Sequence, residues 1–255
     1  MMPDRRRFLI GAAAGTAFLG WASRTQAAAI KFTPEAFGAS GDGTTDDYDA
    51  FVRLIGAVNR EGQATVVLGP GRRYFLDRHI HAGNGIEDLV FSDCDGLTIE
   101  GNRSRISVKG DLYRNRASVR SLSGLVFRNC RLVTLRHFEL AGGVEQTTRV
   151  SALTEPPSHG LAFHGCSDVT IDNMIVRHFA ADGLYIRESR RPGAASMRQA
   201  SRQFEVRNSR FLFNARQALS IIQLRDGLFE NCDFSYTGYI DADGRTGPYG
   251  SHSPG

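Results

Sequence analysis

A pattern of thirteen residues recurs at a fixed interval, and this repeat restricts the possible folds more than any other feature of the chain. The stretches LVFSDCDGLTIEG, LVFRNCRLVTLRH and LAFHGCSDVTIDN begin at Leu89, Leu125 and Leu161, 36 residues apart. Weaker copies begin at Leu184 and Leu219. A constant period in this range is typical of stacked structural repeats. We therefore expect the five leading Leu residues to stack in one column that faces inward.

Apolar and polar residues alternate within each copy, which predicts short strands with one apolar face. In the third copy the runs 161–164 and 167–172 alternate in this way and are separated by the turn-forming stretch GCSD. A further apolar pair, Ile175 and Phe179, predicts a third strand. Three short strands per turn, one inner face and a fixed return distance predict a parallel β-helix.

One position at the end of each copy holds residue types that tolerate a left-handed backbone. This predicts one bend of positive φ per turn, with a ladder of hydrogen-bonded Asn side chains as its extension. The residues at this position are Gly101, His137, Asn173, Asn208 and Asn231.

The first 29 residues are typical of an export signal. Three arginines precede an apolar run from Phe8 to Trp21, which is too short for a membrane span, and small residues follow at Ala27–Ala29. The RRRFL stretch resembles a twin-arginine signal, although Asp4 stands where Ser or Thr is usual, and a basic general secretory signal is the alternative. We therefore predict a signal peptide over residues 1–29, followed by a periplasmic or secreted protein.

The charge of the remaining domain argues against nucleic acid as a partner. The formal net charge of the chain is +4, and the signal segment carries +3 of it, so the domain is nearly neutral. No membrane contact is expected after removal of the signal, and the oligomeric state is left open. Export permits disulfides, but Cys94, Cys130 and Cys166 share one repeat position, which favours a ladder of small buried groups over a disulfide.

An amphipathic helix is predicted before the first copy. Thr45 or Asp46 can begin it, and apolar residues then recur on one face between Ala50 and Val58. Such a helix would cover the open first turn of a β-helix.

The same segment resembles a known family. FGASGDGTTDDYDAF, from Phe37 to Phe51, closely resembles the entry motif of the pectate-lyase-like, right-handed parallel β-helix superfamily, and GPGRRYFL from Gly69 fits the strand that follows. The resemblance implies an all-β, right-handed parallel β-helix over residues 30–255, with an N-terminal capping helix. Similar proteins include polygalacturonases, pectate lyases, alginate-acting enzymes and phage tailspikes.

Aligning the copies by register produces columns of polar residues on the outer surface. The column two residues before each leading Leu contains Glu87, Ser123, His159, Asp182 and Gln217. The column three residues after it contains Ser92, Arg128, His164, Arg187 and Ile222.

The candidate site combines both columns, because acid–base catalysis needs mixed groups within hydrogen-bond reach. Asp182 is expected at the surface of a groove, so that Asp182→Asn would change stability little. The candidate catalytic residues are Asp182, His159 and Arg187. The candidate substrate-binding residues are His164, Tyr185, Arg216, Gln217 and Arg128.

The resemblance leaves the reaction open. DGLYI from Asp182 resembles a polygalacturonase turn in which the Asp is catalytic, but Arg216 and Gln217 stand where those enzymes carry a pair of Asp. An inverting hydrolase needs two separated carboxylates. A lyase instead needs a base, often Arg or Lys in similar folds, and a group that neutralises the uronate; Arg187, Arg216 and Arg128 are candidates for both roles.

We therefore predict an exported carbohydrate-active protein that cleaves, as lyase or hydrolase, or epimerises a polysaccharide containing uronic acids. The alternative is a non-catalytic β-helix that binds glycans or serves as a surface scaffold. No cofactor or metal is predicted, although calcium is left open, since DADG at Asp241–Gly244 is too short for an EF-hand loop. Alternation ends near Tyr236, so we expect the β-helix to be incomplete at Gly255 and the natural chain to continue.

Overall fold

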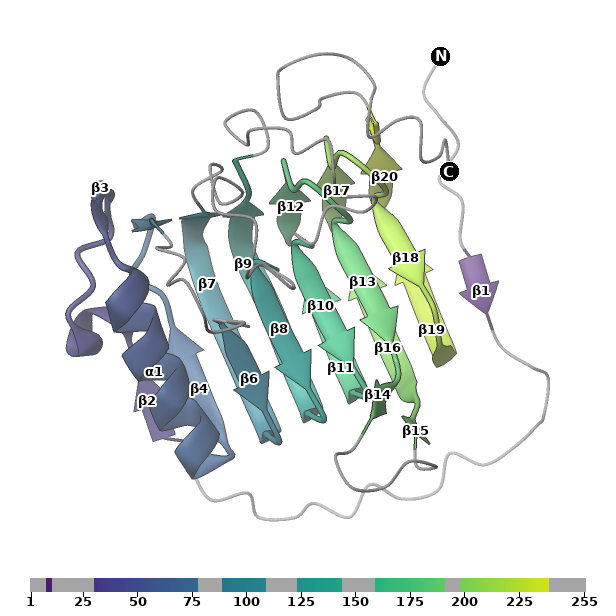
Figure 1. Ribbon diagram of the computed structural model, residues 1–255, viewed down its shortest axis with the longest axis horizontal. Coiled ribbons are helices and arrows are strands. Elements are labelled where there is room, and N and C mark those ends of the chain that lie inside the picture. Colours follow the sequence, from purple (N-terminus) through teal and green to yellow (C-terminus); the bar gives the residue numbers. More distant parts are fainter. Residues whose placement is uncertain are drawn as a thin grey trace, which may run out of the picture.

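The strands wind around one axis as a parallel β-helix, the architecture that the repeat predicts (Figure 1). The computed structural model describes residues 8–10, 30–77, 89–108, 123–143, 159–190 and 198–238. One side of the helix is a five-stranded parallel sheet that takes one strand from each successive turn, or coil. In chain order its strands are β6 (Val90–Ser92), β8 (Leu125–Arg128), β10 (Leu161–His164), β13 (Leu184–Arg187) and β18 (Leu219–Ile221).

The other two sides are continuous with each other because two long strands bend and take part in both. These strands are β7 (Asp95–Val108) and β9 (Arg131–Ala141). The second side is completed by β2 (Ile30–Phe32), β4 (Ala64–Val67), β11 (Ser167–Asp172), β16 (Ser201–Arg207) and β19 (Leu224–Glu230). The third side is completed by β3 (Asp42–Asp46), β5 (Arg73–Leu76), β12 (Ile175–Arg177), β17 (Arg210–Leu212) and β20 (Asp233–Ser235).

Two short antiparallel pairings complete the strand set. The first joins β14 (Ser189–Arg190) to β15 (Arg198–Gln199), two strands that follow β13 in the chain. The second places β1 (Phe8–Ile10) along β19. Strand β1 comes from the segment predicted to be an export signal.

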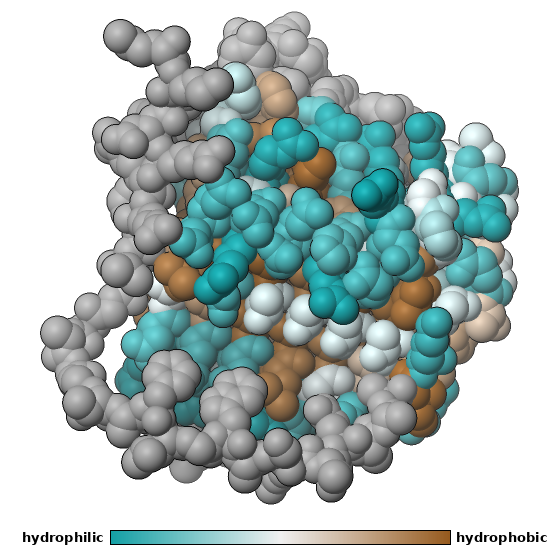
Figure 2. Space-filling model, turned by 180° about the vertical axis from the view of Figure 1, so that it is seen from behind, coloured by the Kyte–Doolittle hydropathy of each residue, from teal (hydrophilic) through white to brown (hydrophobic). Residues whose placement is uncertain are grey.

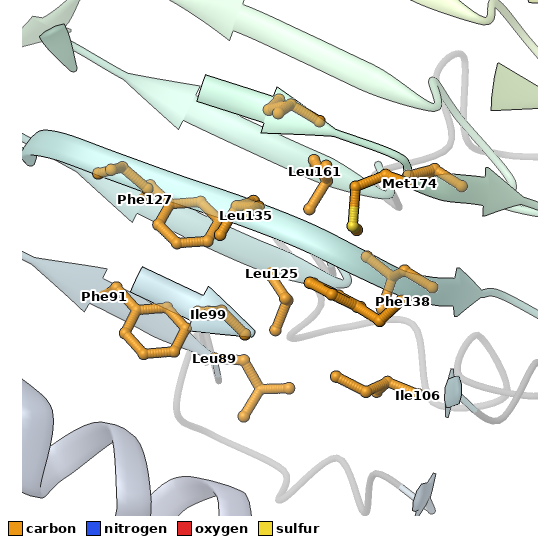
Figure 3. Close-up of a cluster of buried hydrophobic side chains, with 14 of the residues drawn as sticks. Leu89, Phe91, Ile99, Ile106, Leu125, Phe127, Leu135, Phe138, Leu161 and Met174 are labelled. Carbon is orange, nitrogen blue, oxygen red and sulfur yellow. The ribbon is translucent and has the colours of Figure 1, made fainter. Parts of the chain in front are cut away.

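The predicted column of leading Leu residues is confirmed. Leu161 lies opposite Leu125 on one side and Leu184 on the other, and Leu184 lies opposite Leu219. Leu89 is fully buried at the first position of the column. Figure 3 shows the side chains of Leu89, Leu125 and Leu161 following one another through the core.

A second column inside the helix consists of aromatic rings. Phe127 stacks on Phe91 at a centroid distance of 5.2 Å and on Phe163 at 4.7 Å, and the first of these contacts is visible in Figure 3. Stacked rings add a specific attraction to the free energy of burial, which favours the in-register arrangement of the five-stranded sheet. On the third side the prediction needs a correction, because Val176 rather than Ile175 faces the core.

The cysteine column is buried in the reduced form. Cys94, Cys130 and Cys166 are all buried free thiols. The Sγ atoms of Cys130 and Cys166 contact backbone carbonyls of the preceding coil at 3.4 and 3.3 Å. This agrees with a ladder of small buried groups.

The predicted left-handed bend occurs in four of its five positions. The φ angles are 62° at His137, 50° at Asn173, 49° at Asn208 and 54° at Asn231. Asn231 donates to Asn208 at 2.7 Å, but the ladder then continues to Asp172 rather than to the next Asn.

The prediction is wrong at Gly101. In that copy Asn102 and Arg103 have the positive φ angles, because the bend of β7 contains additional residues relative to β9. Gly101 is required for another reason: a Cβ there would lie 2.3 Å from that of Phe138. The glycine permits close approach of two coils rather than a left-handed backbone.

The predicted helix covers the first coil. Helix α1 (Tyr48–Glu61) packs its buried stripe against the core at one end of the solenoid (Figure 1). Asn59 donates to the carbonyl oxygen of Val90 at 2.8 Å and accepts from the amide of Ser92 at 3.0 Å. The side-chain amide of Asn59 thus pairs a backbone carbonyl and a backbone N–H at the edge of β6, as a neighbouring strand would.

The stretch before α1 forms a hydrogen-bonded turn. Asp47 is buried and accepts from the amides of Ser40 and Gly41 at 2.6 and 3.1 Å. Asp46 accepts from the amide of Tyr48 at 2.9 Å, so it is Asp46, of the two predicted residues, that binds the first turn of the helix.

The outer surface is mainly polar. In the view from behind, hydrophilic side chains cover most of the described surface, with hydrophobic residues visible between them (Figure 2). Ion pairs connect neighbouring coils on the second side, such as Arg131 with Asp95 at 2.7 Å and Arg136 with Glu100 at 2.6 Å. Opposite charges therefore face each other across these coils.

Candidate functional site

The column that precedes the five-stranded sheet is confirmed for its four described members. Main-chain hydrogen bonds connect successive coils here, since Gly124 donates to His159, Gly160 to Asp182 and Gly183 to Gln217. These bonds align Ser123, His159, Asp182 and Gln217 along the axis at the strand spacing of about 4.8 Å. Glu87 lies outside the described residues.

Asp182 lies at the centre of a buried ion pair. Its side chain is fully buried, and the guanidinium of Arg216 donates two hydrogen bonds to the carboxylate. Nε donates to Oδ1 at 2.7 Å, and Nη2 donates to Oδ2. Burial alone would raise the pKa of Asp182, but hydrogen bonds from Arg216 and His159 outweigh it and lower the pKa to about 2. The carboxylate is therefore ionised at neutral pH.

One prediction is corrected by this arrangement. Asp182 is not a surface residue, so Asp182→Asn is not a surface substitution. Arg216, predicted to bind substrate, directs its guanidinium at Asp182. The sequence contains a signal for this pairing. Arg216 directly precedes Gln217, and Gln217 occupies in the next coil the register position that Asp182 occupies in its own.

His159 is the second partner of the Asp182 carboxylate. Its Nδ1 lies 3.3 Å from Oδ2 of Asp182, and the backbone amide of Asp182 approaches the same nitrogen as a donor at 3.4 Å. A carboxylate has only acceptors, and as the charged partner it outweighs the amide, so it favours the tautomer with the proton on Nδ1, which leaves the lone pair of Nε2 available. The side chain of His159 is 14% exposed, so it is more accessible than Asp182.

Tyr185 connects the two predicted columns. Its ring stacks on the imidazole of His159 with a centroid distance of 4.2 Å and an angle of 11°. The same ring meets His164 edge-on at 6.3 Å, and the guanidinium carbon of Arg187 lies 5.9 Å from its centroid. The structure therefore brings these four predicted residues into one cluster.

The column on the outer face of the sheet is also confirmed. Arg128 lies opposite His164, and His164 lies opposite Arg187, in the strand register. Nη2 of Arg187 lies 3.5 Å from Nδ1 of His164. Ile222, the last member, follows β18 and is 62% exposed.

The charges of this column affect one another. His164 is buried, and its burial, together with Arg187 and Arg128, lowers its pKa to about 3, so the imidazole is neutral at neutral pH. Burial and the charge of Arg187 also lower the pKa of Arg128. Two guanidinium groups are thus held beside one neutral histidine.

Gln217 lies next to Asp182 in its column, and its side chain is bound by Ser220. The hydroxyl of Ser220 donates to Oε1 of Gln217. Ser220 lies opposite Tyr185 in the strand register and is not among the predicted site residues. Its register position is the signal that would have identified it.

Neither a metal centre nor a membrane span is found in the described part of the chain. No three His, Cys, Asp or Glu side chains gather there as metal ligands. The stretch Asp241–Gly244, considered for calcium, lies outside the described residues. None of the described helical segments has the length and hydrophobicity needed to cross a bilayer.

Comparison with known proteins gives one relative by sequence and several solved structures. No family model matches the chain. Over 159 residues, 60% of this chain, it is 26% identical to "Depolymerase 1, capsule KN3-specific" of Klebsiella phage KN3-1, and this region spans 18% of that protein.

The solved structures include two modules from Azotobacter vinelandii. The A-module of the mannuronan C-5 epimerase AlgE6 is 22% identical, with a TM-score of 0.49, and the match covers 72% of this chain and 44% of that one. The A-module of AlgE4 is 21% identical, with a TM-score of 0.45, and the match covers 71% and 45%. The chain spans less than half of either structure.

Proposed function

We propose that the protein is an exported enzyme that acts on a polysaccharide, with His159 as the catalytic base. The observation that carries this proposal is the chain of contacts from Arg216 through the buried Asp182 to His159. A buried carboxylate that accepts from Nδ1 fixes the imidazole in orientation and tautomer, and it stabilises the imidazolium that forms when Nε2 takes a proton. Arg216 is a positioning residue that holds this carboxylate ionised.

The reaction that fits is removal of the C5 proton of a uronic acid residue. Nε2 of His159 takes this proton, and the electron pair stays at C5 and is delocalised into the uronate carboxylate. In a lyase this pair then forms a C4=C5 double bond while the bond from C4 to the glycosidic oxygen breaks, and that oxygen takes a proton from water or from the His159 imidazolium and leaves as a hydroxyl. In an epimerase the bond to the glycosidic oxygen stays intact, and C5 takes a proton from water on the opposite face.

A reaction with a single base agrees better with the site than hydrolysis does. Glycoside hydrolases use two carboxylates about 5–10 Å apart. Within the described residues, the contacts of the cluster include one carboxylate, that of Asp182, and Arg216 holds both of its oxygens. It is therefore not available as a nucleophile or a proton donor.

The choice of a polysaccharide rests on two supports. A β-helix presents its outer residues in columns about 4.8 Å apart, which suits a long polymer better than a small molecule. The sequence relative is named as a capsule depolymerase. Export by the segment 1–29, as a twin-arginine or a general secretory signal, would bring the domain to the periplasm or the medium, where such polymers occur.

Incubation with a panel of uronate polysaccharides tests the proposal. A lyase produces an unsaturated uronate with strong ultraviolet absorbance, whereas an epimerase exchanges the C5 hydrogen with deuterated solvent without chain cleavage. His159→Ala should lower kcat by about 100-fold or more. His178→Asn is the matched control, because it removes a histidine from another bend whose φ of 60° Asn tolerates.

The outcomes separate the proposed enzyme from the alternative role. Product formation that His159→Ala abolishes and His178→Asn retains supports the proposal. Tight binding of a polymer without product or exchange would instead support a non-catalytic glycan-binding β-helix. Equal activity of the two variants would remove His159 from the mechanism.

A further inference from the structure

The three cysteines of the buried column lie on adjacent coils, at a separation that suits a disulfide. The amide of Arg131 donates to the carbonyl oxygen of Cys94 at 2.7 Å, and the amide of Ser167 donates to that of Cys130 at 3.0 Å. These bonds place the Cα atoms of neighbouring cysteines about 4.8 Å apart, within the range of about 4.4–6.8 Å found across disulfides. All three side chains are in the core, where Cys94 and Cys130 are 1% exposed and Cys166 is 0% exposed. The backbone therefore already has the spacing that a bond between two of these sulfurs needs.

The thiols of this column are also in contact with one another. The thiol of Cys130 forms hydrogen bonds with that of Cys94 on one side and with that of Cys166 on the other. The hydrogen bonds from Cys166 and Cys94 lower the pKa of Cys130. The hydrogen bond with Cys130 and burial raise the pKa of Cys94, and burial is the main cause that raises the pKa of Cys166. Cys130 is therefore the thiol that most readily becomes a nucleophilic thiolate.

Packing alone does not require sulfur in this column. Ser201 continues the column on the next coil, where the amide of Arg202 donates to the carbonyl oxygen of Cys166 at 3.0 Å. The hydroxyl of Ser201 accepts from the amide of Cys166 at 3.1 Å and donates to the carbonyl oxygen of Arg187 at 2.8 Å. Leu224 lies opposite Ser201 on the coil after that. The same register position thus accommodates a hydroxyl and an apolar side chain, so the three thiols differ from these neighbours in reactivity rather than in fit.

We propose that Cys130 is a redox modification site, which forms a disulfide with Cys94 or Cys166 when an oxidised low-molecular-weight thiol reaches the column. The Cys130 thiolate attacks one sulfur of the oxidant, the S–S bond of the oxidant breaks, and the departing thiolate takes a proton. A neighbouring cysteine then loses its proton and attacks the Cys130 sulfur of the mixed disulfide, which releases the second small thiol. Two protein thiols are oxidised, and one small disulfide is reduced to two thiols. Because three cysteines form one pair, one thiol of the column stays free.

Burial determines when this reaction can occur. A small disulfide is larger than a water molecule and cannot contact sulfurs that are at most 1% exposed, so the coils must open before the first step. The reduced column of the structure is thus protected once the coils are stacked, and the bond forms while the chain folds or opens. The bond would join residues 36 positions apart and would constrain the unfolded chain. The oxidised protein should therefore unfold at a higher urea concentration than the reduced protein.

Oxidation of the full chain in urea, measured by mass spectrometry, tests the site. The chain carries Cys232→Ser, because Cys232 is half-buried and lies outside the column. It is incubated with oxidised glutathione in water and at urea concentrations just below the unfolding midpoint, where opening is transient and no refolding step is needed. We expect the samples in urea to lose about 2 Da, the mass of two hydrogens, and to keep one thiol that reacts with an alkylating reagent after denaturation. The samples in water should keep all three thiols, and peptide mapping of the oxidised samples should find Cys130 in the bond.

Serine variants of the column assign the bond to Cys130. Cys130→Ser should abolish the loss of mass, because Cys94 and Cys166 are two coils apart, about 9–10 Å, which exceeds the limit of about 7 Å for a disulfide. Cys94→Ser and Cys166→Ser are the matched controls, and each should retain the loss through the remaining pair. Ser201 shows that the column accommodates serine, and circular dichroism verifies that each variant is folded.

Three results would overturn the inference. The first is three free thiols after oxidation at every urea concentration, which needs no variant to interpret. The second is a stable glutathione adduct without a protein disulfide, because a neighbouring thiol should displace the glutathione. The third is a disulfide that persists in the folded Cys130→Ser variant. All three readouts are masses or thiol counts, so they do not depend on whether the protein turns over a polymer.

Discussion

Replacing Asp182 by asparagine tests whether the buried ion pair is as important as its geometry implies. The carboxamide has nearly the volume of the carboxylate, so the substitution creates no cavity and changes mainly charge and hydrogen bonding. Arg216 would keep one oxygen acceptor and would face an NH₂ group in place of the other. A guanidinium with little exposure would then lack its counter-charge.

The magnitude follows from the two partners. Lowering the pKa of Asp182 from 3.8 to about 2 corresponds to about 2 kcal/mol of stability at neutral pH. Breaking a fully buried pair costs about 3–5 kcal/mol, but Arg216 is 16% exposed and keeps some hydration. We therefore expect Asp182→Asn to lower the free energy of unfolding by about 2–3 kcal/mol.

Urea denaturation followed by circular dichroism measures this loss. Arg216→Gln and the double variant complete a cycle, and a coupling energy of about 1–2 kcal/mol is expected because the two side chains are in direct contact. The folded pKa is below the unfolded one, so the wild type should lose this contribution as the pH falls from 3.8 to about 2. The Asp182→Asn variant should lack that loss.

A change within about 0.5 kcal/mol, the range of an ordinary surface substitution, would refute the reasoning. So would additive effects in the cycle, because they would mean that Arg216 does not stabilise Asp182. Either result would leave His159 without a fixed carboxylate and would weaken the catalytic proposal.

Two further predictions concern the same coils. His164 has its ordinary pKa of 6.5 in the unfolded chain and a pKa of about 3 in the folded protein, where burial and the neighbouring Arg187, Arg128 and His159 disfavour the charged ring. The free energy of unfolding of the wild type should therefore decrease as the pH falls from 6.5 to about 3, by about 4–5 kcal/mol at most. His164→Gln should make this decrease smaller in thermal melts recorded across the same pH range. An unchanged slope in the variant would contradict the neutral imidazole. Gly183→Ala should destabilise the fold by about 1–3 kcal/mol, because its Cβ would lie 2.5 Å from Nδ2 of Asn214, whereas Gly56→Ala in α1, with 3.7 Å to its nearest neighbour, should be neutral or stabilising in the same melts. Equal stability of the two glycine variants would show that the coils at Gly183 are not tightly packed.

The fold could be predicted because the information that specifies it is periodic. The 36-residue repeat and the two-residue alternation identify the inner face of each strand, and burial of apolar side chains enforces that choice. The leading Leu column and the cap by α1 follow from these patterns. A one-residue error in strand register would turn the apolar side chains of that strand outward, so burial allows only one register. Aligning the copies in the sequence therefore predicts which residues of neighbouring coils lie opposite each other.

The local exceptions could not be predicted in the same way. Gly101 occupies the bend position of its copy, but additional residues in β7 move the left-handed backbone to Asn102 and Arg103. Ile175 and Val176 are equally apolar neighbours, and only the path of the third side determines which of them is buried. In both cases the chain has two locally acceptable conformations, and packing against the next coil selects one.

For the candidate site, the sequence by itself determined which residues share a column, because register fixes the order of side chains along the axis. It placed His159 beside Asp182, and Arg128, His164 and Arg187 in one row. The tertiary structure decided what each group does there. Burial determines that Asp182 is a held carboxylate rather than a surface one, that Arg216 is directed at this carboxylate, and that His164 is neutral. These properties depend on desolvation and on distances of a few ångströms, which arise only when the coils are stacked.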